Sequence, residues 1–120
     1  MDITLTDREA EFMEVLWERG PSTVAEVREQ LKDEPAYTTV LTIMRNLEGK
    51  GYVGPSKDGR AHRYAPLVER DAAQRSALRS LSTKLFKGSV ELLVTHLVED
   101  KKLSDAEIKR IRTLLNQRKK

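Results

Sequence analysis

Three threonines and an arginine lie close together in residues 36–50, a segment whose apolar residues recur with the period of an α-helix. At about 100° per residue, Thr38, Thr42 and Arg45 fall opposite the apolar stripe, and Thr39 lies at the margin of that face. A threonine is short enough to approach a base closely, and it offers a hydrogen-bond donor and a methyl group that contacts thymine. Because a recognition helix enters the major groove with its N-terminal residues, the pattern predicts base reading by Thr38, Thr39 and Thr42.

The same pattern has a purely structural interpretation. Threonines at the start of a helix often only cap it. Leu41, on the same side of the helix, can pack as an outlying core residue. A second basic element beside this helix is therefore needed before DNA binding is inferred.

A basic β-hairpin is predicted directly after this helix. Residues 52–53 and 61–64 have strand-like character and flank Asp58-Gly59, a dipeptide typical of tight hairpin turns. The side chains suited to contact the DNA backbone lie on the preceding helix and on the hairpin. They are Arg45 on the helix and Lys57, Arg60, Arg63 and Tyr64 on the hairpin. The alternative is a basic turn that only faces solvent.

Capping boxes mark three helix starts. In this motif a Ser or Thr side chain accepts from the backbone N–H of a Glu three residues on, and the Glu reaches back. The pairs are Thr6 with Glu9, Thr23 with Glu26, and Ser104 with Glu107. They predict helices over residues 7–19 and 24–32 before the helix at 36–50. Three short helices followed by a hairpin are the layout of a winged helix-turn-helix.

The chain changes character near Pro66. All four prolines and five of the six glycines lie before residue 67, and only Gly88 interrupts the remainder. Residues 1–66 hold 9 basic and 12 acidic side chains, whereas residues 67–120 hold 13 and 7. We therefore predict a mostly α protein with two domains, a winged-helix DNA-binding domain at 1–66 and a three-helix domain at 67–120.

The second predicted domain carries more apolar surface than it can cover. Its 54 residues cannot enclose the apolar stripes of three helices, which predicts homodimerisation. The predicted dimer contacts are Leu78, Leu81, Leu85, Leu92, Leu93, Leu97, Ile108, Ile111 and Leu115. A two-fold dimer presents two reading helices about 34 Å apart, or a multiple of that distance, to a palindromic operator. The alternative is that these helices fold back over the first domain.

Composition excludes several kinds of function. The chain has 120 residues and no cysteine, which rules out disulfides, thiolate nucleophiles and metal sites that need sulfur. Its two histidines, His62 and His96, lie in different halves, and no phosphate-binding loop or catalytic triad can be assembled. We expect no enzyme, no cofactor and no metal site.

Charge and hydropathy indicate where the protein works. The net charge is +3, no apolar run is long enough to span a bilayer, and residues 1–11 are too acidic for a signal peptide. We expect a cytoplasmic protein that has no membrane contact and binds double-stranded DNA.

Four stretches resemble the BlaI/MecI family of penicillinase and methicillin-resistance repressors, which also includes the copper repressor CopY. Residues 5–17, LTDREAEFMEVLW, resemble the first helix of that family. Residues 37–53, YTTVLTIMRNLEGKGYV, resemble its recognition helix, and residues 57–64, KDGRAHRY, its wing. Residues 86–89, FKGS, resemble a motif of its dimerisation helices. The similarity covers almost the whole chain, and the third helix with the wing is its most specific part.

This resemblance implies a dimeric winged-helix repressor on a palindromic promoter element. It places Thr39 and Thr42 where family members touch bases, and Thr38 at a variable neighbouring position. In the family, a membrane-bound metalloprotease sensor for β-lactams leads to cleavage of an Asn-Phe bond within the dimerisation helices. His96-Leu97 stands at that position here, so the chain departs from the family at the cleavage site. The absence of cysteine excludes the copper-sensing hook of the copper branch.

Two other functions fit the same fold. A winged-helix protein–protein adaptor buries the face of its third helix against a partner protein, and Leu41 is the residue that favours this alternative. A direct ligand sensor needs a pocket between the two halves, for which the sequence offers no convergent polar groups.

Overall fold

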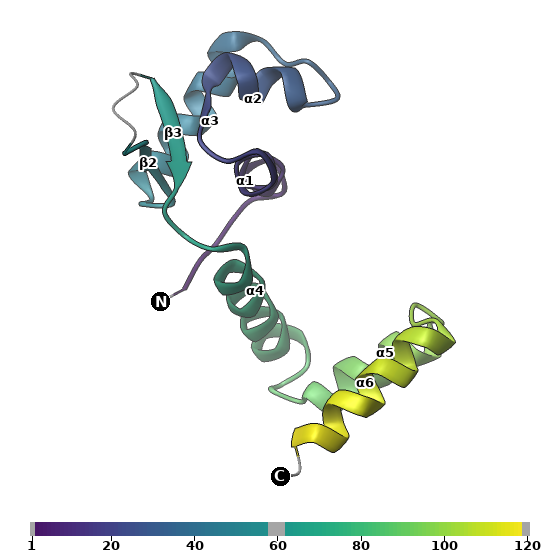
Figure 1. Ribbon diagram of the computed structural model, residues 1–120. Coiled ribbons are helices and arrows are strands. Elements are labelled where there is room, and N and C mark those ends of the chain that lie inside the picture. Colours follow the sequence, from purple (N-terminus) through teal and green to yellow (C-terminus); the bar gives the residue numbers. More distant parts are fainter. Residues whose placement is uncertain (1, 58–61, 119–120) are drawn as a thin grey trace. The chain divides into compact units, whose positions relative to one another are not determined.

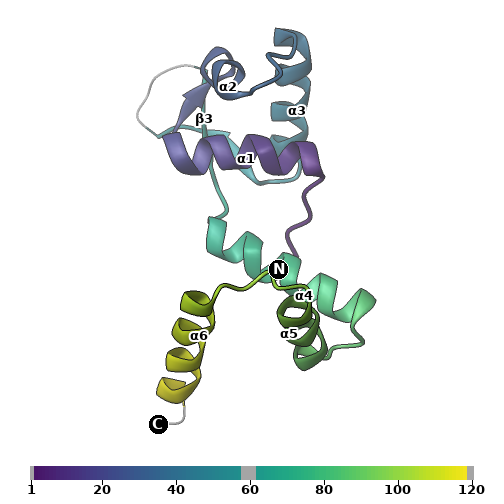
Figure 2. The same ribbon diagram turned by 90° about the vertical axis from the view of Figure 1, so that its right-hand side faces the viewer.

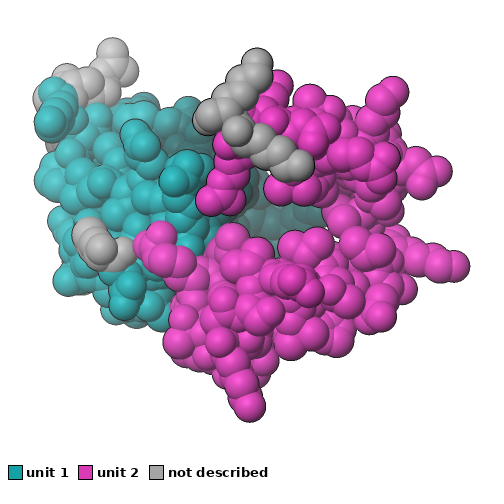
Figure 3. All heavy atoms as spheres, turned by 90° about the horizontal axis from the view of Figure 1, so that it is seen from below, with its two compact units in different colours: residues 1–77 teal, residues 78–120 magenta. Residues whose placement is uncertain are grey.

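A computed structural model describes residues 2–57 and 62–118 of the chain. Within them the elements follow one another along the chain as shown in Figures 1 and 2. They are α1 (Asp7–Arg19), β1 (Ser22–Thr23), α2 (Val24–Gln30), α3 (Tyr37–Gly49), β2 (Val53–Pro55), β3 (Arg63–Pro66), α4 (Arg70–Leu85), α5 (Val90–Glu99) and α6 (Asp105–Arg118). The chain divides into two compact units, residues 1–77 and residues 78–120 (Figure 3). The predicted mostly α fold is confirmed.

The predicted capping boxes are present at all three helix starts. At α1 the Glu9 N–H donates to the Thr6 hydroxyl at 3.1 Å, and the Thr6 N–H donates to the Glu9 carboxylate at 2.8 Å. Equivalent reciprocal pairs open α2 and α6. The predicted end of α2 at residue 32 is too late. The helix stops at Gln30, because Leu31 adopts an extended backbone and is buried in the core.

The core of the first unit lies between α1, α2, α3 and the small sheet. Its fully buried apolar side chains come from each of these elements: Phe12, Met13, Leu16, Val27, Val40, Met44, Leu47 and Val53. Burying one such side chain contributes about 1.5–3 kcal/mol, so these contacts fix how the three helices pack. This packing decides which face of α3 is left to solvent.

The sheet has three antiparallel strands in the order β1-β3-β2. Ser22 pairs with Tyr64 and Thr23 with Arg63, whereas Pro55 on β2 faces Tyr64 from the other side. The two-residue strand β1 was not predicted. The hairpin strand β2 begins at Val53 rather than Tyr52, because the Tyr52 N–H donates to the Leu47 carbonyl and helps to close α3.

Gly51 gives α3 the predicted left-handed end. Its φ is +83°, a conformation that glycine adopts without steric cost. The Gly51 N–H donates to the Glu48 carbonyl, so the chain reverses from the helix directly into β2. The predicted turn at Asp58-Gly59, between β2 and β3, lies outside the described residues.

The compact units meet after Ala77, eleven residues later than the predicted boundary at Pro66. The first turns of α4 belong to the first unit because Ala73 and Ser76 are buried there. The Ser76 hydroxyl accepts from the Ile3 N–H at 2.8 Å and donates to the Ile3 carbonyl at 3.2 Å. Arg70, the first residue of α4, forms ion pairs with Glu14 and Glu18 of α1. The assignment of separate roles to the two halves stays a prediction.

The second unit contains the rest of α4 together with α5 and α6. Gly88, with φ of +81°, separates α4 from α5 as predicted, and the Ser89 side chain caps α5. Neither α5 nor α6 contains a buried residue among those described. Among the described residues, each helix is too short or too polar to cross a membrane.

Candidate nucleic-acid interface

The packing of α3 turns its threonines outward. Val40, Met44 and Leu47 are fully buried, so the helix is fixed against the core along one side. The other side carries four predicted DNA contacts, all exposed: Thr38, Thr39, Thr42 and Arg45. Their exposure fits base and backbone contacts, and those contacts stay a prediction.

Leu41 does not extend this exposed face. It is half-buried and packs against the core cluster, which agrees with its interpretation as an outlying core residue. The outer face of α3 therefore consists of short hydroxyls followed by a cation, with the aliphatic residue withdrawn. A surface of this kind suits the polar edges of bases better than an apolar protein groove.

α3 begins one residue later than the predicted helix at 36–50. The helix starts after Ala36, which provides no side-chain cap, and its first residue, Tyr37, is 52% exposed. The uncapped end directs backbone N–H groups and a partial positive charge outward. Tyr37 is absent from the predicted contacts.

The predicted wing contacts differ in their environments. Lys57 is exposed, and Tyr64 is half-buried and packs against the core cluster. Arg60 lies outside the described residues. His62, just before β3, is exposed and has a φ of +70°. The structure thus places Lys57 in an exposed turn after β2 and Tyr64 on β3, the middle strand of the sheet.

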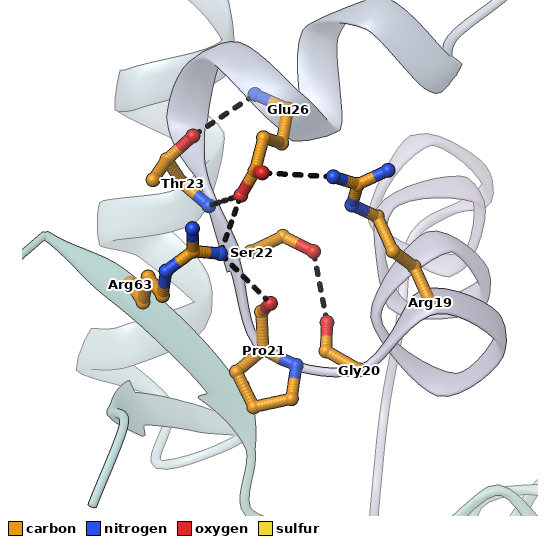
Figure 4. A network of polar contacts seen from close by, with 7 residues as sticks. All are labelled: Arg19, Gly20, Pro21, Ser22, Thr23, Glu26 and Arg63. Carbon is orange, nitrogen blue, oxygen red and sulfur yellow. Dashed lines mark hydrogen bonds and ion pairs between the residues drawn. The ribbon is translucent and has the colours of Figure 1, made fainter. Parts of the chain in front are cut away.

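Arg63 is held by a carboxylate. Its guanidinium Nη1 donates to Glu26 Oε1 at 2.7 Å, and Glu26 Oε2 accepts from Arg19 at 2.8 Å (Figure 4). The main-chain N–H of Thr23, the Arg19 guanidinium and the charge of Arg63 lower the pKa of Glu26 to about 2. The sequence predicted Glu26 only as a capping residue, and no local pattern reveals its two arginine partners.

The predicted dimer contacts are mostly uncovered in the single chain. Two of them, Leu93 and Ile108, are half-buried. The others are exposed, with exposed fractions between 38% and 72%: Leu78, Leu81, Leu85, Leu92, Leu97, Ile111 and Leu115. Val90, Val94, Val98 and Leu114 are also exposed apolar residues of α5 and α6. Large exposed apolar side chains in this number fit an interaction surface, and the dimer contacts stay a prediction.

Comparisons with known proteins identify the family of this chain. The model of the penicillinase repressor family matches residues 5–117. The chain belongs to the penicillinase repressor family. The resemblance found in the sequence is thereby confirmed.

Three relatives illustrate the range of this family. The transcriptional regulator BlaI of Mycobacterium tuberculosis strain H37Rv is 38% identical over 79% of this chain and 72% of its own length. The methicillin resistance regulatory protein MecI of Staphylococcus aureus strain Mu50 is 27% identical over 95% of this chain and 94% of its own. The penicillinase repressor of Bacillus licheniformis is 25% identical over 96% of this chain and 91% of its own length. Relatives in the penicillinase repressor family are thus named as regulators and repressors.

A solved structure supports the fold. A MarR family protein from Bacillus stearothermophilus aligns with 98% of this chain and 78% of its own, with a TM-score of 0.52 and 20% sequence identity. At this identity the likeness concerns the fold alone. It confirms the winged-helix prediction for this member of the penicillinase repressor family.

The residues at the expected cleavage position of the penicillinase repressor family lie within α5. His96 is exposed and its ring centroid is 5.8 Å from that of Phe86, whereas Leu97 is 38% exposed. Both residues are in regular helix, so a protease needs local unfolding of α5 to reach the bond between them.

Proposed function

We propose that this protein is a sequence-specific DNA-binding transcriptional repressor that binds a palindromic operator as a homodimer. The observation that carries the proposal is the outer face of α3, where Thr38, Thr39 and Thr42 are exposed while the opposite side is locked in the core. The names of the relatives as repressors and regulators support the same function.

In this proposal α3 enters the major groove and its threonines meet base edges. Arg45, one turn later on the exposed face, contacts the phosphate backbone. Lys57 and Arg60 of the wing contact phosphates beyond the groove, and the Tyr64 hydroxyl contributes a further backbone contact. Phosphate contacts fix the register of the protein, and the threonines supply its sequence preference.

The homodimer is proposed from the apolar surface of the second unit. The exposed leucines and valines on α5 and α6 have exposed fractions of 38–63% in the single chain. A second copy of the same surface covers them through a two-fold axis. Two α3 helices related by that axis then read two half-sites about 34 Å apart, or a multiple of this distance.

Repression in this account ends when the dimer is broken. Cleavage of α5 at His96-Leu97 would remove much of the dimer surface, since both α5 and α6 contribute to it. The partner required for such a step is a protease linked to a membrane sensor, as the family resemblance implies. The protein itself is proposed to be non-enzymatic and to act in the cytoplasm on double-stranded DNA.

Band-shift titration with the promoter of the protein's own gene tests the proposal. Specific binding should exceed binding to a scrambled fragment of equal length by at least about 10³-fold, and it should weaken steeply with salt. Equal affinity for promoter and scrambled DNA would contradict sequence-specific repression. Binding to neither DNA at low salt would favour the adaptor function instead.

A further inference from the structure

The carboxylate of Glu26 joins three separate parts of the first unit (Figure 4). It lies on α2, and it accepts from Arg19 at the end of α1 and from Arg63 on β3. It also accepts from the Thr23 N–H at 2.9 Å as part of the capping box. One side chain therefore connects the first helix, the second helix and the strand that leads out of the wing.

The sheet register brings Arg63 to this carboxylate. Thr23 on β1 pairs with Arg63 on β3, so the arginine leaves the sheet beside the start of α2. Its Nη1 also donates to the Pro21 carbonyl at 3.4 Å. Pro21 lies in the turn between α1 and α2, and Glu26 lies in the first turn of α2. β3 is therefore fastened to the same helix pair that supports α3.

The charge of Arg63 is largely satisfied inside the protein. Its side chain is 26% exposed, and that of Glu26 is 24% exposed, so the pair is partly shielded from solvent. By contrast, Arg45 and Lys57 are exposed and form no ion pair within the described residues. A phosphate has to compete with a charge-assisted hydrogen bond to recruit Arg63, whereas the other two cations are free to bind one.

We infer that Glu26 is a positioning residue for DNA binding, which holds Arg63 and thereby sets the place of β3 and the wing beside α3. In this role Glu26 also withholds Arg63 from the DNA phosphates, so that Arg63 orients the wing instead of neutralising the backbone. The inference rests on the proposed function, because it assigns a role within the DNA-binding surface.

Glu26→Gln tests this role without removing the helix cap, since glutamine also completes a capping box. Glu29→Gln is the matched control, because Glu29 is an exposed residue of the same helix and makes no ion pair within the described chain. Both variants change the net charge by the same amount. The measurements are affinity for promoter DNA and for scrambled DNA as a function of salt, together with the melting temperature.

Glu26→Gln should weaken promoter binding by roughly tenfold, the scale of one lost charge-assisted hydrogen bond. Its affinity for scrambled DNA should not fall, because the released Arg63 adds a free cation. The salt slope on scrambled DNA should become steeper by about 0.9, the value for one more neutralised phosphate. Glu29→Gln should leave the promoter preference at the wild-type value.

Arg63→Gln supplies an independent measurement. We expect it to lower promoter affinity about as much as Glu26→Gln, to leave the salt slope unchanged, and to be non-additive with Glu26→Gln. A salt slope reduced by about 0.9 would identify Arg63 as a phosphate ligand and overturn the inference.

Two further outcomes would also overturn the inference. One is identical behaviour of Glu26→Gln and Glu29→Gln on both DNAs. The other is that Glu26→Gln has a lower melting temperature and loses affinity for promoter and scrambled DNA alike. That result would indicate a purely structural role of Glu26. Failure of the proposed function is seen separately, as wild-type protein that shows no preference for its promoter.

Discussion

The hydroxyl of Thr42 donates a hydrogen bond to the main-chain carbonyl of Thr38, one turn earlier on α3, across 2.9 Å. Because the only hydrogen of the hydroxyl is engaged, the oxygen can act toward DNA only as an acceptor. The methyl group remains available for contact with thymine. Thr42 is therefore suited to a thymine methyl or an exocyclic amino group, and not to the acceptor edge of guanine.

Replacing Thr42 by alanine should cost about 1–3 kcal/mol of binding free energy on the promoter and nothing on scrambled DNA, because only base readout depends on sequence. Band-shift titrations of both fragments measure this difference. Thr42→Val is the matched variant that keeps a methyl group and removes the oxygen. Equal losses on the two DNAs after Thr42→Ala would exclude base reading by this residue.

Replacing Arg45 by alanine should weaken binding to promoter and scrambled DNA equally, because a phosphate contact carries no sequence information. The slope of log K against log salt should become shallower by about 0.9. Arg112→Ala, an exposed substitution on α6, provides the control and should leave the slope unchanged. A loss confined to the promoter would instead assign Arg45 to base reading.

Ser76 ties the beginning of α4 to the N-terminal segment. Its side chain is buried and exchanges two hydrogen bonds with Ile3, so Ser76→Ala leaves a buried backbone donor and acceptor unpaired. We expect a loss of about 1–3 kcal/mol in unfolding free energy, measured by urea denaturation. Ser80→Ala, an exposed change on the same helix, should stay within about 0.5 kcal/mol of wild type. Equal effects of the two changes would show that these hydrogen bonds do not stabilise the fold.

Several features of both units follow from local sequence chemistry. Each predicted capping box begins a helix, because the motif satisfies backbone donors within four residues and needs no distant partner. The outward face of α3 followed from helical periodicity in the same way. These features were predictable because their causes lie within one or two turns of chain.

The features that were missed depend on distant partners. β1 has two residues and exists because Ser22 pairs with Tyr64, so no local pattern announces it. The Arg63–Glu26 ion pair joins residues 37 positions apart and depends on the register of that sheet. The division of the compact units after Ala77 also depends on distant residues, because α4 residues are buried against the N-terminal part of the chain. The predicted domains at 1–66 and 67–120 stay a prediction.

The pKa of Glu26 predicts a pH dependence of stability. Its partners lower this pKa from 4.5 to about 2, so the carboxylate stabilises the folded state fully above about pH 4.5. That contribution is lost as the pH falls toward about 2, where the folded protein also binds the proton. Urea denaturation of wild type and Glu26→Gln should therefore differ at neutral pH and converge in acid.

Glu9 also has a lowered pKa, but it does not affect this comparison. Burial raises its pKa, but the hydrogen bonds from Lys50 and Thr6 outweigh burial and lower it overall. Because Glu9 titrates in both proteins, its contribution cancels in the comparison. A stability difference between wild type and Glu26→Gln that stays constant from neutral to acid pH would contradict the assigned ion pairs.

The exposed leucines of α6 predict that a single substitution on this helix prevents dimer formation. Leu115 is 57% exposed in the single chain, so Leu115→Lys should leave the fold intact and disrupt only contacts with a second copy. Thr113→Lys is the control, because Thr113 is exposed and lies on the opposite side of α6. Sedimentation velocity should report monomers for Leu115→Lys and dimers for Thr113→Lys. Dimers of both variants would place the interface elsewhere.

The central claim is that paired copies of the chain recognise one promoter element through their α3 helices. Sedimentation of a labelled promoter fragment with the protein at micromolar concentration, in excess calf-thymus DNA, tests it most directly. The account predicts a complex of two chains per fragment that survives the competitor. A strictly monomeric protein, or a fragment that loses its protein to the competitor, would contradict the account.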